Sequence, residues 1–171
     1  MQVRGGFMGE KESKPYDYTY ALKVKDSGKS KEFIETWLKG VYYGLQTLDD
    51  ETAKKVLSKC GRDCAKIFLR LYGRDLSKMT LEDWIRIYGE AEGCKCERNG
   101  DYIIYEFKPT KCECLLVEEG LVKLTPKLCS ACFTNWLEYQ LSTVTGKNVK
   151  AELVESLATG SNKCVFKIWL K

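Results

Sequence analysis

The stretch CKCERNGDYIIYEFKPTKCECLLVEEG, residues 94–120, decides the fold, because it sets four of the chain's nine cysteines on either side of Asn99-Gly100. Asn-Gly between runs of alternating residues is typical of a two-residue β-hairpin turn of type I′. In that register Cys96 faces Ile103 across the hairpin. The stretch therefore predicts an antiparallel pair of strands with cysteines on the face that carries the apolar side chains.

A third strand is predicted after the turn "KPTK", residues 108–111. Phe107 then faces Cys112 and Tyr105 faces Cys114. The outer strands of such a sheet lie two spacings apart, about 10 Å. Zinc–sulfur bonds of about 2.3 Å cannot easily span that distance. The four cysteines of this segment therefore do not form a zinc site by themselves, and they either recruit sulfur from elsewhere or pack as small apolar residues.

Three helices are predicted before the hairpin. Apolar residues recur at helical spacing over residues 30–41. A second helix begins near residues 49–50 and ends at Gly73. A third begins at Thr80, and Asp83 completes a capping box. The predicted buried stripe of the second helix consists of Val56, Leu57, Cys60, Cys64, Ile67, Phe68 and Leu71.

One helix and two strands are predicted after the hairpin. Thr125-Pro126 is a favourable helix start, Gly146 ends that helix, and "NVKAELVESLA" and "CVFKIWL" follow as strands. The order is helices, three strands, helix, two strands. We expect an α+β fold in which N-terminal helices pack on an antiparallel sheet. Residues 1–15 are interpreted as a flexible leader and residues 16–171 as a single domain.

The sequence has nine cysteines and no histidine, which limits the catalytic and metal-binding chemistry that the protein can perform. The absence of histidine excludes Ser-His-Asp and Cys-His nucleophile pairs and every histidine-containing zinc site. A net charge of +4 is too small to indicate direct nucleic-acid binding. The sequence shows no signal peptide and no apolar stretch of membrane-spanning length. We therefore expect a cytoplasmic protein, in which cysteines are free thiols or metal ligands.

Four groups of cysteines are candidate metal ligands. Cys129 and Cys132 form a Cys-x-x-Cys motif near a helix start, which suits half a metal site, core packing or a redox pair. Cys60 and Cys64 lie one helical turn apart, which suits two ligands or an apolar stripe. Cys164 opens the last strand. The hairpin segment adds a fourth group.

The run from Cys129 to Leu170 resembles the carboxy-terminal half of V4R domains, the 4-vinyl reductase type of bacteria and archaea. The resemblance rests on a helix that opens on cysteine, on "TGKNV", on the strand "VKAELVESLATG" and on "NKCVFKI". It covers mainly residues 112–171. It implies the NO-signalling and Golgi-transport ligand-binding fold, similar to vesicle-tethering subunits, often dimeric, with a structural zinc beside an apolar pocket.

Carried over to this sequence, the family's helix cysteine corresponds to Cys129 or Cys132, and its last cysteine to Cys164. Two further family ligands, an acidic residue and a cysteine, fall near Leu153 and on Ser156; this chain lacks that cysteine, although Glu152 and Glu155 lie close by in the sequence. A zinc site therefore needs other sulfurs, and the candidate metal ligands are Cys112, Cys114, Cys129, Cys132, Cys164, Cys60 and Cys64. Thiolates of this number suit zinc or an iron–sulfur cluster.

The leading hypothesis is a non-catalytic sensor module that binds a small apolar or aromatic ligand and a cysteine-held metal. Its predicted pocket residues are Trp37, Tyr105, Phe107 and Trp136. The resemblance implies a homodimer, and the lack of an output segment implies a separate output protein. Neither a membrane nor nucleic acid is an expected partner.

Two alternatives stay open. The first is an enzyme, a hydrolase or reductase acting on a small cyclic or vinyl-bearing substrate, with Cys129 or Cys132 as the reactive thiol and Glu155 or Tyr105 nearby. The second is a scaffold for protein assembly. A closed cavity would favour the sensor, a thiol of strongly lowered pKa the enzyme, and a large apolar surface patch the scaffold.

Overall fold

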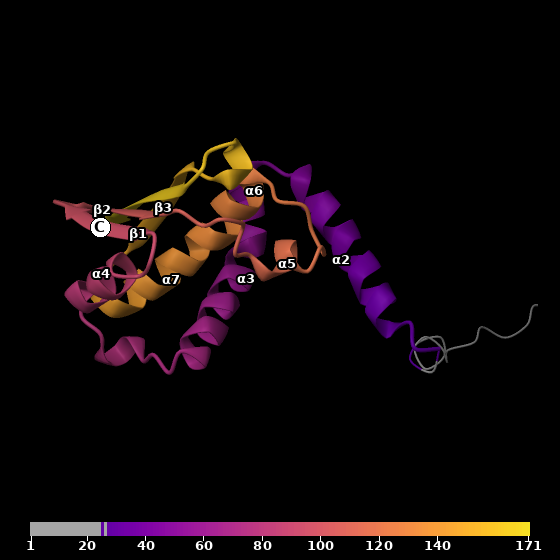
Figure 1. Ribbon diagram of the computed structural model, residues 1–171, viewed down its shortest axis with the longest axis horizontal. Coiled ribbons are helices and arrows are strands. Elements are labelled where there is room, and N and C mark those ends of the chain that lie inside the picture. Colours follow the sequence, from indigo (N-terminus) through magenta and orange to yellow (C-terminus); the bar gives the residue numbers. More distant parts are fainter. Residues whose placement is uncertain (1–24, 26) are drawn as a thin grey trace, which may run out of the picture. The chain divides into compact units, whose positions relative to one another are not determined.

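The computed structural model describes residue 25 and residues 27–171 (Figure 1). The predicted leader, residues 1–15, and the segment "YDYTYALKV", residues 16–24, lie outside the described residues. The chain divides into two units, residues 1–37 and residues 38–171. The described part of the first unit contains the beginning of one helix, and all the packing reported below belongs to the second.

The predicted α+β class is confirmed, with helices followed by a four-stranded antiparallel sheet (Figure 1). No helix in the described part of the chain is both long and apolar enough to cross a membrane. The elements are α2 (Ser30–Gln46), α3 (Asp50–Leu71), η1 (Leu76–Lys78), α4 (Leu81–Gly89), β1 (Cys94–Asn99), β2 (Tyr102–Phe107), α5 (Leu115–Glu118), α6 (Pro126–Leu128), η2 (Cys129–Phe133), α7 (Thr134–Thr145), β3 (Val149–Glu155), η3 (Leu157–Thr159) and β4 (Cys164–Leu170).

The helix boundaries follow the predicted capping residues. The Asp49 side chain accepts a hydrogen bond from the Thr52 amide at the start of α3. Thr80 and Asp83 form the predicted capping box of α4. Gly146, with φ of 67°, ends α7 in the left-handed conformation that glycine adopts without strain. Local backbone chemistry was therefore a sufficient guide to these boundaries.

The hairpin forms, but its turn differs from the predicted one. The turn residues are Gly100 and Asp101, and Cys96 faces Tyr105 instead of Ile103. Gly100 has φ of 62°, and no residue other than glycine has a positive φ among those that the structure describes. Glycine at the first central position alone is typical of a type II′ turn, whereas type I′ would also need a positive φ at the second.

The predicted third strand is not the partner of β2. Residues 108–114 form a loop that leads to α5, and β2 pairs instead with β4, so that Phe107 faces Cys164. The strand order is β1-β2-β4-β3. Pro109 interrupts the loop segment and lacks an amide proton for a ladder, whereas β4 supplies six consecutive partners, four of which have buried apolar side chains. Cys112 and Cys114 therefore lie outside the sheet.

The second unit has three layers. Helices α4 and α7 pack on one face of the sheet, and α3 packs on the other side of α7 (Figure 1). Fully buried side chains from the inner face of the sheet and from α4 and α7 meet in this core, among them Trp84, Ile103, Leu137, Leu141, Phe166 and Ile168. The outer face of the sheet carries partly exposed residues such as Lys167, whose ammonium group lies 4.2 Å from the Tyr102 ring centroid.

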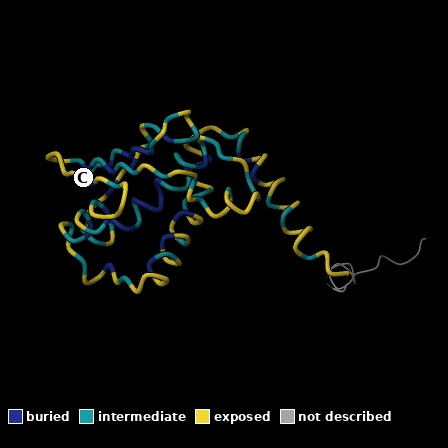
Figure 2. The backbone as a smooth tube through the Cα atoms, viewed as in Figure 1, coloured by how far each residue is buried: buried dark blue, intermediate teal, exposed yellow. Residues whose placement is uncertain are grey.

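The buried face of α3 is not the predicted one. The predicted buried stripe is largely exposed, whereas Ala53, Gly61, Ala65 and Leu69 are buried. Buried and exposed segments alternate along this helix (Figure 2). A Cβ on Gly61 would lie 2.9 Å from the Asn135 Cβ and still closer to the Cys132 carbonyl oxygen. The small residues of α3 thus face η2 and α7 because only they allow so close an approach.

We expect Gly61→Ala to destabilise the protein by about 2 kcal/mol or more, because the added methyl group overpacks the contact of α3 with η2. Gly40→Ala in α2 is the matched control, since a Cβ there meets nothing within 4 Å. It should stabilise by about 0.5–1 kcal/mol through helix propensity alone. Urea unfolding curves measure both changes, and equal effects would contradict the close packing at Gly61.

Candidate functional site

The seven predicted metal cysteines lie in one neighbourhood of the fold, although they come from four segments. Burial, together with the charges of Cys64, Cys60 and Cys114, raises the pKa of Cys132 to about 12. Burial, and to a smaller extent charge on Cys164 and Cys112, likewise raises the pKa of Cys129. Helix α3, the loop before α5, η2 and the start of β4 therefore bring their thiols to one side of the core.

Ser156 lies where the V4R resemblance puts a cysteine ligand. Burial raises the pKa of Cys129 to about 11, and a hydrogen bond with the Ser156 side chain opposes that rise. Ser156 is fully buried and caps η3, where its oxygen accepts a hydrogen bond from the Ala158 amide at 3.2 Å. A hydroxyl group thus lies beside Cys129 at the position where the resemblance implies a thiol.

The cysteines as placed do not fit a zinc ion or an iron–sulfur cluster. Residues 25 and 27–171 contain no group of three or more Cys, Asp or Glu side chains close enough to hold a metal ion. Cys112 and Cys114 lie on a loop outside the sheet, and the Ser156 hydroxyl is a poorer zinc ligand than a thiolate. A bound zinc or iron–sulfur cluster stays a prediction, and no chemistry is derived from it.

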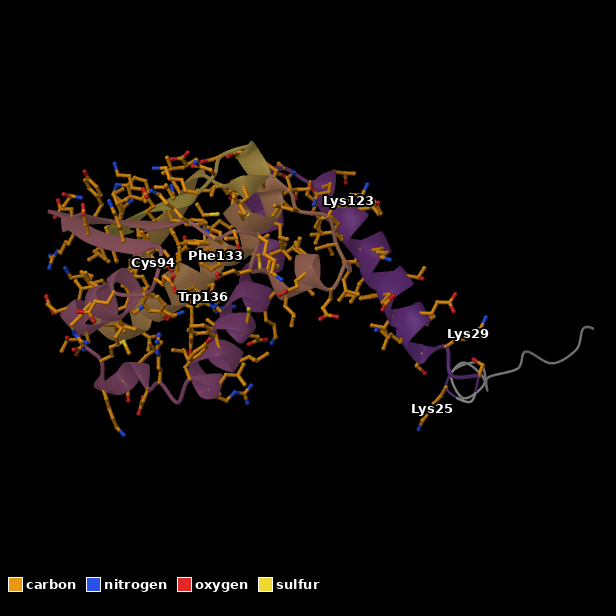
Figure 3. The ribbon with its side chains drawn as sticks, in the orientation of Figure 1. Lys25, Lys29, Cys94, Lys123, Phe133 and Trp136 are labelled. Atoms are coloured by element: carbon orange, nitrogen blue, oxygen red, sulfur yellow. The ribbon has the colours of Figure 1, made fainter. Side chains whose placement is uncertain are left out.

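Three of the predicted pocket residues pack in an aromatic core. The rings of Tyr105 and Phe107 lie 5.4 Å apart between centroids. Phe133 and Trp136 stack at 5.0 Å (Figure 3), and Phe133 also contacts Phe166 at 4.9 Å. These rings fill the space between the sheet, η2 and α7 with one another. The fourth predicted residue, Trp37, is 60% exposed on α2.

The residues of the enzyme hypothesis have no activated nucleophile among them. Both Cys129 and Cys132 have a raised pKa, whereas a reactive cysteine needs a lowered one. Burial raises the pKa of Tyr105 as well. The Glu155 carboxylate accepts a hydrogen bond from Ser161 at 2.7 Å and pairs with Lys163 at 3.3 Å. Their raised pKa values keep the thiols of Cys129 and Cys132 protonated at neutral pH.

An exposed apolar stripe on α3 was missed by the sequence interpretation, which placed the same residues in the core. It comprises Leu57, Cys60, Cys64, Ile67 and Leu71, hereafter the α3 stripe. Ile67 is 51% exposed and Leu71 78% exposed, Cys60 and Cys64 are exposed, and only Leu57 is partly covered. The signal that could have located it is Gly61 and Ala65, which mark the face that packs closely.

Two surface hollows also lie outside the predicted site. One, of about 520 Å³, is formed by the end of α3, η1 and α7, and Arg70, Arg74 and Tyr139 are among its lining residues. The other, of about 330 Å³, is lined by Glu51, Lys54, Lys55, Ser58 and Asn135. Neither is lined by a predicted pocket residue, and no hydrophobic pattern in the sequence marks either of them.

No protein-family model and no curated protein matches the sequence. Among solved structures, the chain is similar to a crystal structure of a trafficking protein particle complex subunit 3 from Naegleria fowleri, covalently bound to palmitic acid. The two share 14% sequence identity with a TM-score of 0.47, over 82% of this chain and 96% of that one. A likeness at this level does not establish a family.

We expect the thiols to react in order of exposure and pKa. At pH 8 a thiol with a pKa of about 12, such as that of Cys132, is ionised in roughly one molecule in ten thousand. In dilute solution, where no second copy covers α3, the exposed Cys60 should therefore be alkylated by iodoacetamide long before Cys132. Mass spectrometry of peptides after timed labelling measures the order, with denatured protein as the control. Equal labelling of the two in the folded protein would contradict the described burial.

Proposed function

We propose that the chain is a protein-assembly module that forms a homodimer through the α3 stripe. The observation that carries this proposal is an apolar helix face left in solvent on a helix that is already packed on its other side. Contiguous exposed apolar surface on a soluble protein is characteristic of an interaction site. Such a surface is the feature that favours the scaffold alternative over the sensor and the enzyme.

The spacing of the α3 stripe favours another helix as the partner. Its five residues follow one another at intervals of three, four, three and four, which is the heptad pattern of helix pairs. With 22 residues, α3 is about 33 Å long. The stripe contains no charged side chain, whereas Lys59 and Asp63 lie beside it. An apolar seam with a charged rim is typical of a protein interface.

A second copy of the chain fits the stripe because the stripe is self-complementary. In a two-fold dimer each patch meets its own counterpart. Antiparallel α3 helices would set Leu57 against Leu71 of the partner subunit, with Cys64 at the midpoint facing its counterpart. An antiparallel pair also opposes the two helix dipoles. It separates Lys59 from its own copy, whereas a parallel pair would bring the two together.

The dimer model predicts which cysteine can be crosslinked between subunits. Because Cys64 lies at the midpoint, a short bis-maleimide should join it to its counterpart and give a covalent dimer in denaturing electrophoresis. Antiparallel geometry offsets each Cys60 from its counterpart by about 12 Å along the helices. We therefore expect Cys64→Ser to abolish the covalent dimer and Cys60→Ser to retain it.

The two serine variants also test the orientation. A parallel pair would bring both cysteines next to their counterparts, so either single variant would still crosslink, and the antiparallel model would be wrong. If the unmodified protein forms no covalent dimer at concentrations where it is folded, the proposed interface itself is contradicted.

A charge in the stripe should uncouple stability from protein concentration. The melting temperature of a dimer rises with concentration by mass action. Ile67→Glu buries an unpaired carboxylate in the interface, so dimer affinity should fall about 100-fold or more and the melting temperature should become independent of concentration. Val154→Glu is the matched control, because Val154 is 58% exposed on β3, away from the stripe. A similar loss in both variants would locate the interface elsewhere.

A further inference from the structure

We infer that the hollow formed by the end of α3, η1 and α7 is a binding site for a small aryl phosphate. Its volume of about 520 Å³ is in the range of small-molecule sites. It belongs wholly to the second unit of the chain. Its position is distinct from the α3 stripe, because Lys66 and Leu69 project from the far side of the helix.

Positive charge predominates in this hollow. Lys66, Arg70 and Arg74 line it, against the single carboxylate of Asp75. In the part of the chain that the structure describes, neither arginine forms an ion pair, whereas Lys66 pairs with Asp63 at 3.4 Å. The C-terminal end of α3 contributes only about half a negative charge. The hollow therefore retains a net positive field that an anion could neutralise.

The one carboxylate in the hollow is already occupied. Asp75 Oδ1 accepts hydrogen bonds from the Ser77 amide at 3.0 Å and from the Ser77 hydroxyl at 2.6 Å. Its other oxygen lies 3.4 Å from Lys78 Nζ. Asp75 thus caps η1 and pairs with a lysine outside the hollow. It does not compete for the two guanidinium groups.

Arg74 is held in place before any ligand arrives. Its guanidinium carbon lies 5.7 Å from the Phe68 ring centroid and 5.4 Å from those of Tyr72 and Tyr88. Its amide donates to the Leu69 carbonyl oxygen at 2.8 Å, as the chain turns at Gly73. A guanidinium fixed between rings loses little side-chain entropy when it binds a phosphate through two parallel hydrogen bonds.

The remaining walls suit an aromatic group joined to the phosphate. Leu69 and Leu76 are buried and form an apolar floor. Tyr139 presents its ring at the edge, with Lys66 Nζ 5.6 Å from the centroid. The hydroxyl group of Thr143 completes the lining. Apolar walls beside two guanidinium groups favour an aryl phosphate over inorganic phosphate alone.

Isothermal titration of the full chain with phenyl phosphate, inorganic phosphate and phenol tests the inference. We expect one saturable site for phenyl phosphate, binding about tenfold weaker for inorganic phosphate, and no binding for phenol. Arg70→Gln should weaken phenyl phosphate binding about tenfold or more, since it removes a charge-assisted hydrogen bond. Arg62→Gln is the matched control, because Arg62 is an exposed arginine of α3 outside the hollow.

Arg74→Lys provides a second variant, which keeps the positive charge but removes the guanidinium group that can donate two parallel hydrogen bonds. It should weaken binding as well, and the Arg70→Gln result stands even if this change disturbs the ring packing. Equal losses in Arg70→Gln and Arg62→Gln would overturn the inference, because they would show a general charge effect. Binding to phosphatidic acid vesicles but not to phenyl phosphate would also overturn it, because the partner would then be a lipid surface.

Discussion

The close contact of α3 with η2 and α7 at Gly61 is the constraint on which the rest of the second unit depends. Because no Cβ fits there, α3 must turn its small residues inward and leave most of its larger apolar residues in solvent. The α3 stripe is therefore a direct consequence of tight packing on the other face. This orientation of α3 also directs Lys66 and Arg70 toward the hollow beside η1. Both proposed binding surfaces therefore result from the close packing at Gly61.

Helix α7 connects all the layers through two polar side chains, the partly buried Glu138 and the fully buried Gln140. The Glu138 carboxylate accepts from Lys54 Nζ at 2.6 Å and from the Ala151 amide at 2.8 Å, which joins α3, α7 and β3. Gln140 Oε1 accepts from Trp84 Nε1 at 3.1 Å and from the Tyr88 hydroxyl at 2.7 Å, which joins α4. These hydrogen bonds orient the helices more specifically than apolar contact alone, although Gln140 Nε2 is buried without a hydrogen-bond partner.

Local chemistry made much of the fold predictable, whereas long-range choices were not. Asp49, Thr80 and Gly146 act within a few residues of their own helix, so their roles could be predicted from neighbouring sequence. The partner of β2 depends on competition between two distant segments, which no local pattern reveals. The buried face of α3 was misassigned because apolar size was taken as the mark of burial, although close packing selected small residues. The seven cysteines that were predicted as metal ligands lie in one neighbourhood. The sequence analysis placed Cys112 and Cys114 on a strand, however, whereas they lie on a loop.

Sedimentation equilibrium of the unmodified chain over a hundredfold concentration range tests the central claim most directly. An interface built on the α3 stripe predicts twice the 19.6 kDa mass of one chain at micromolar concentration, with dissociation on dilution. A mass of one chain at every concentration would contradict the account, because the exposed apolar face of α3 would then have no partner in a second copy.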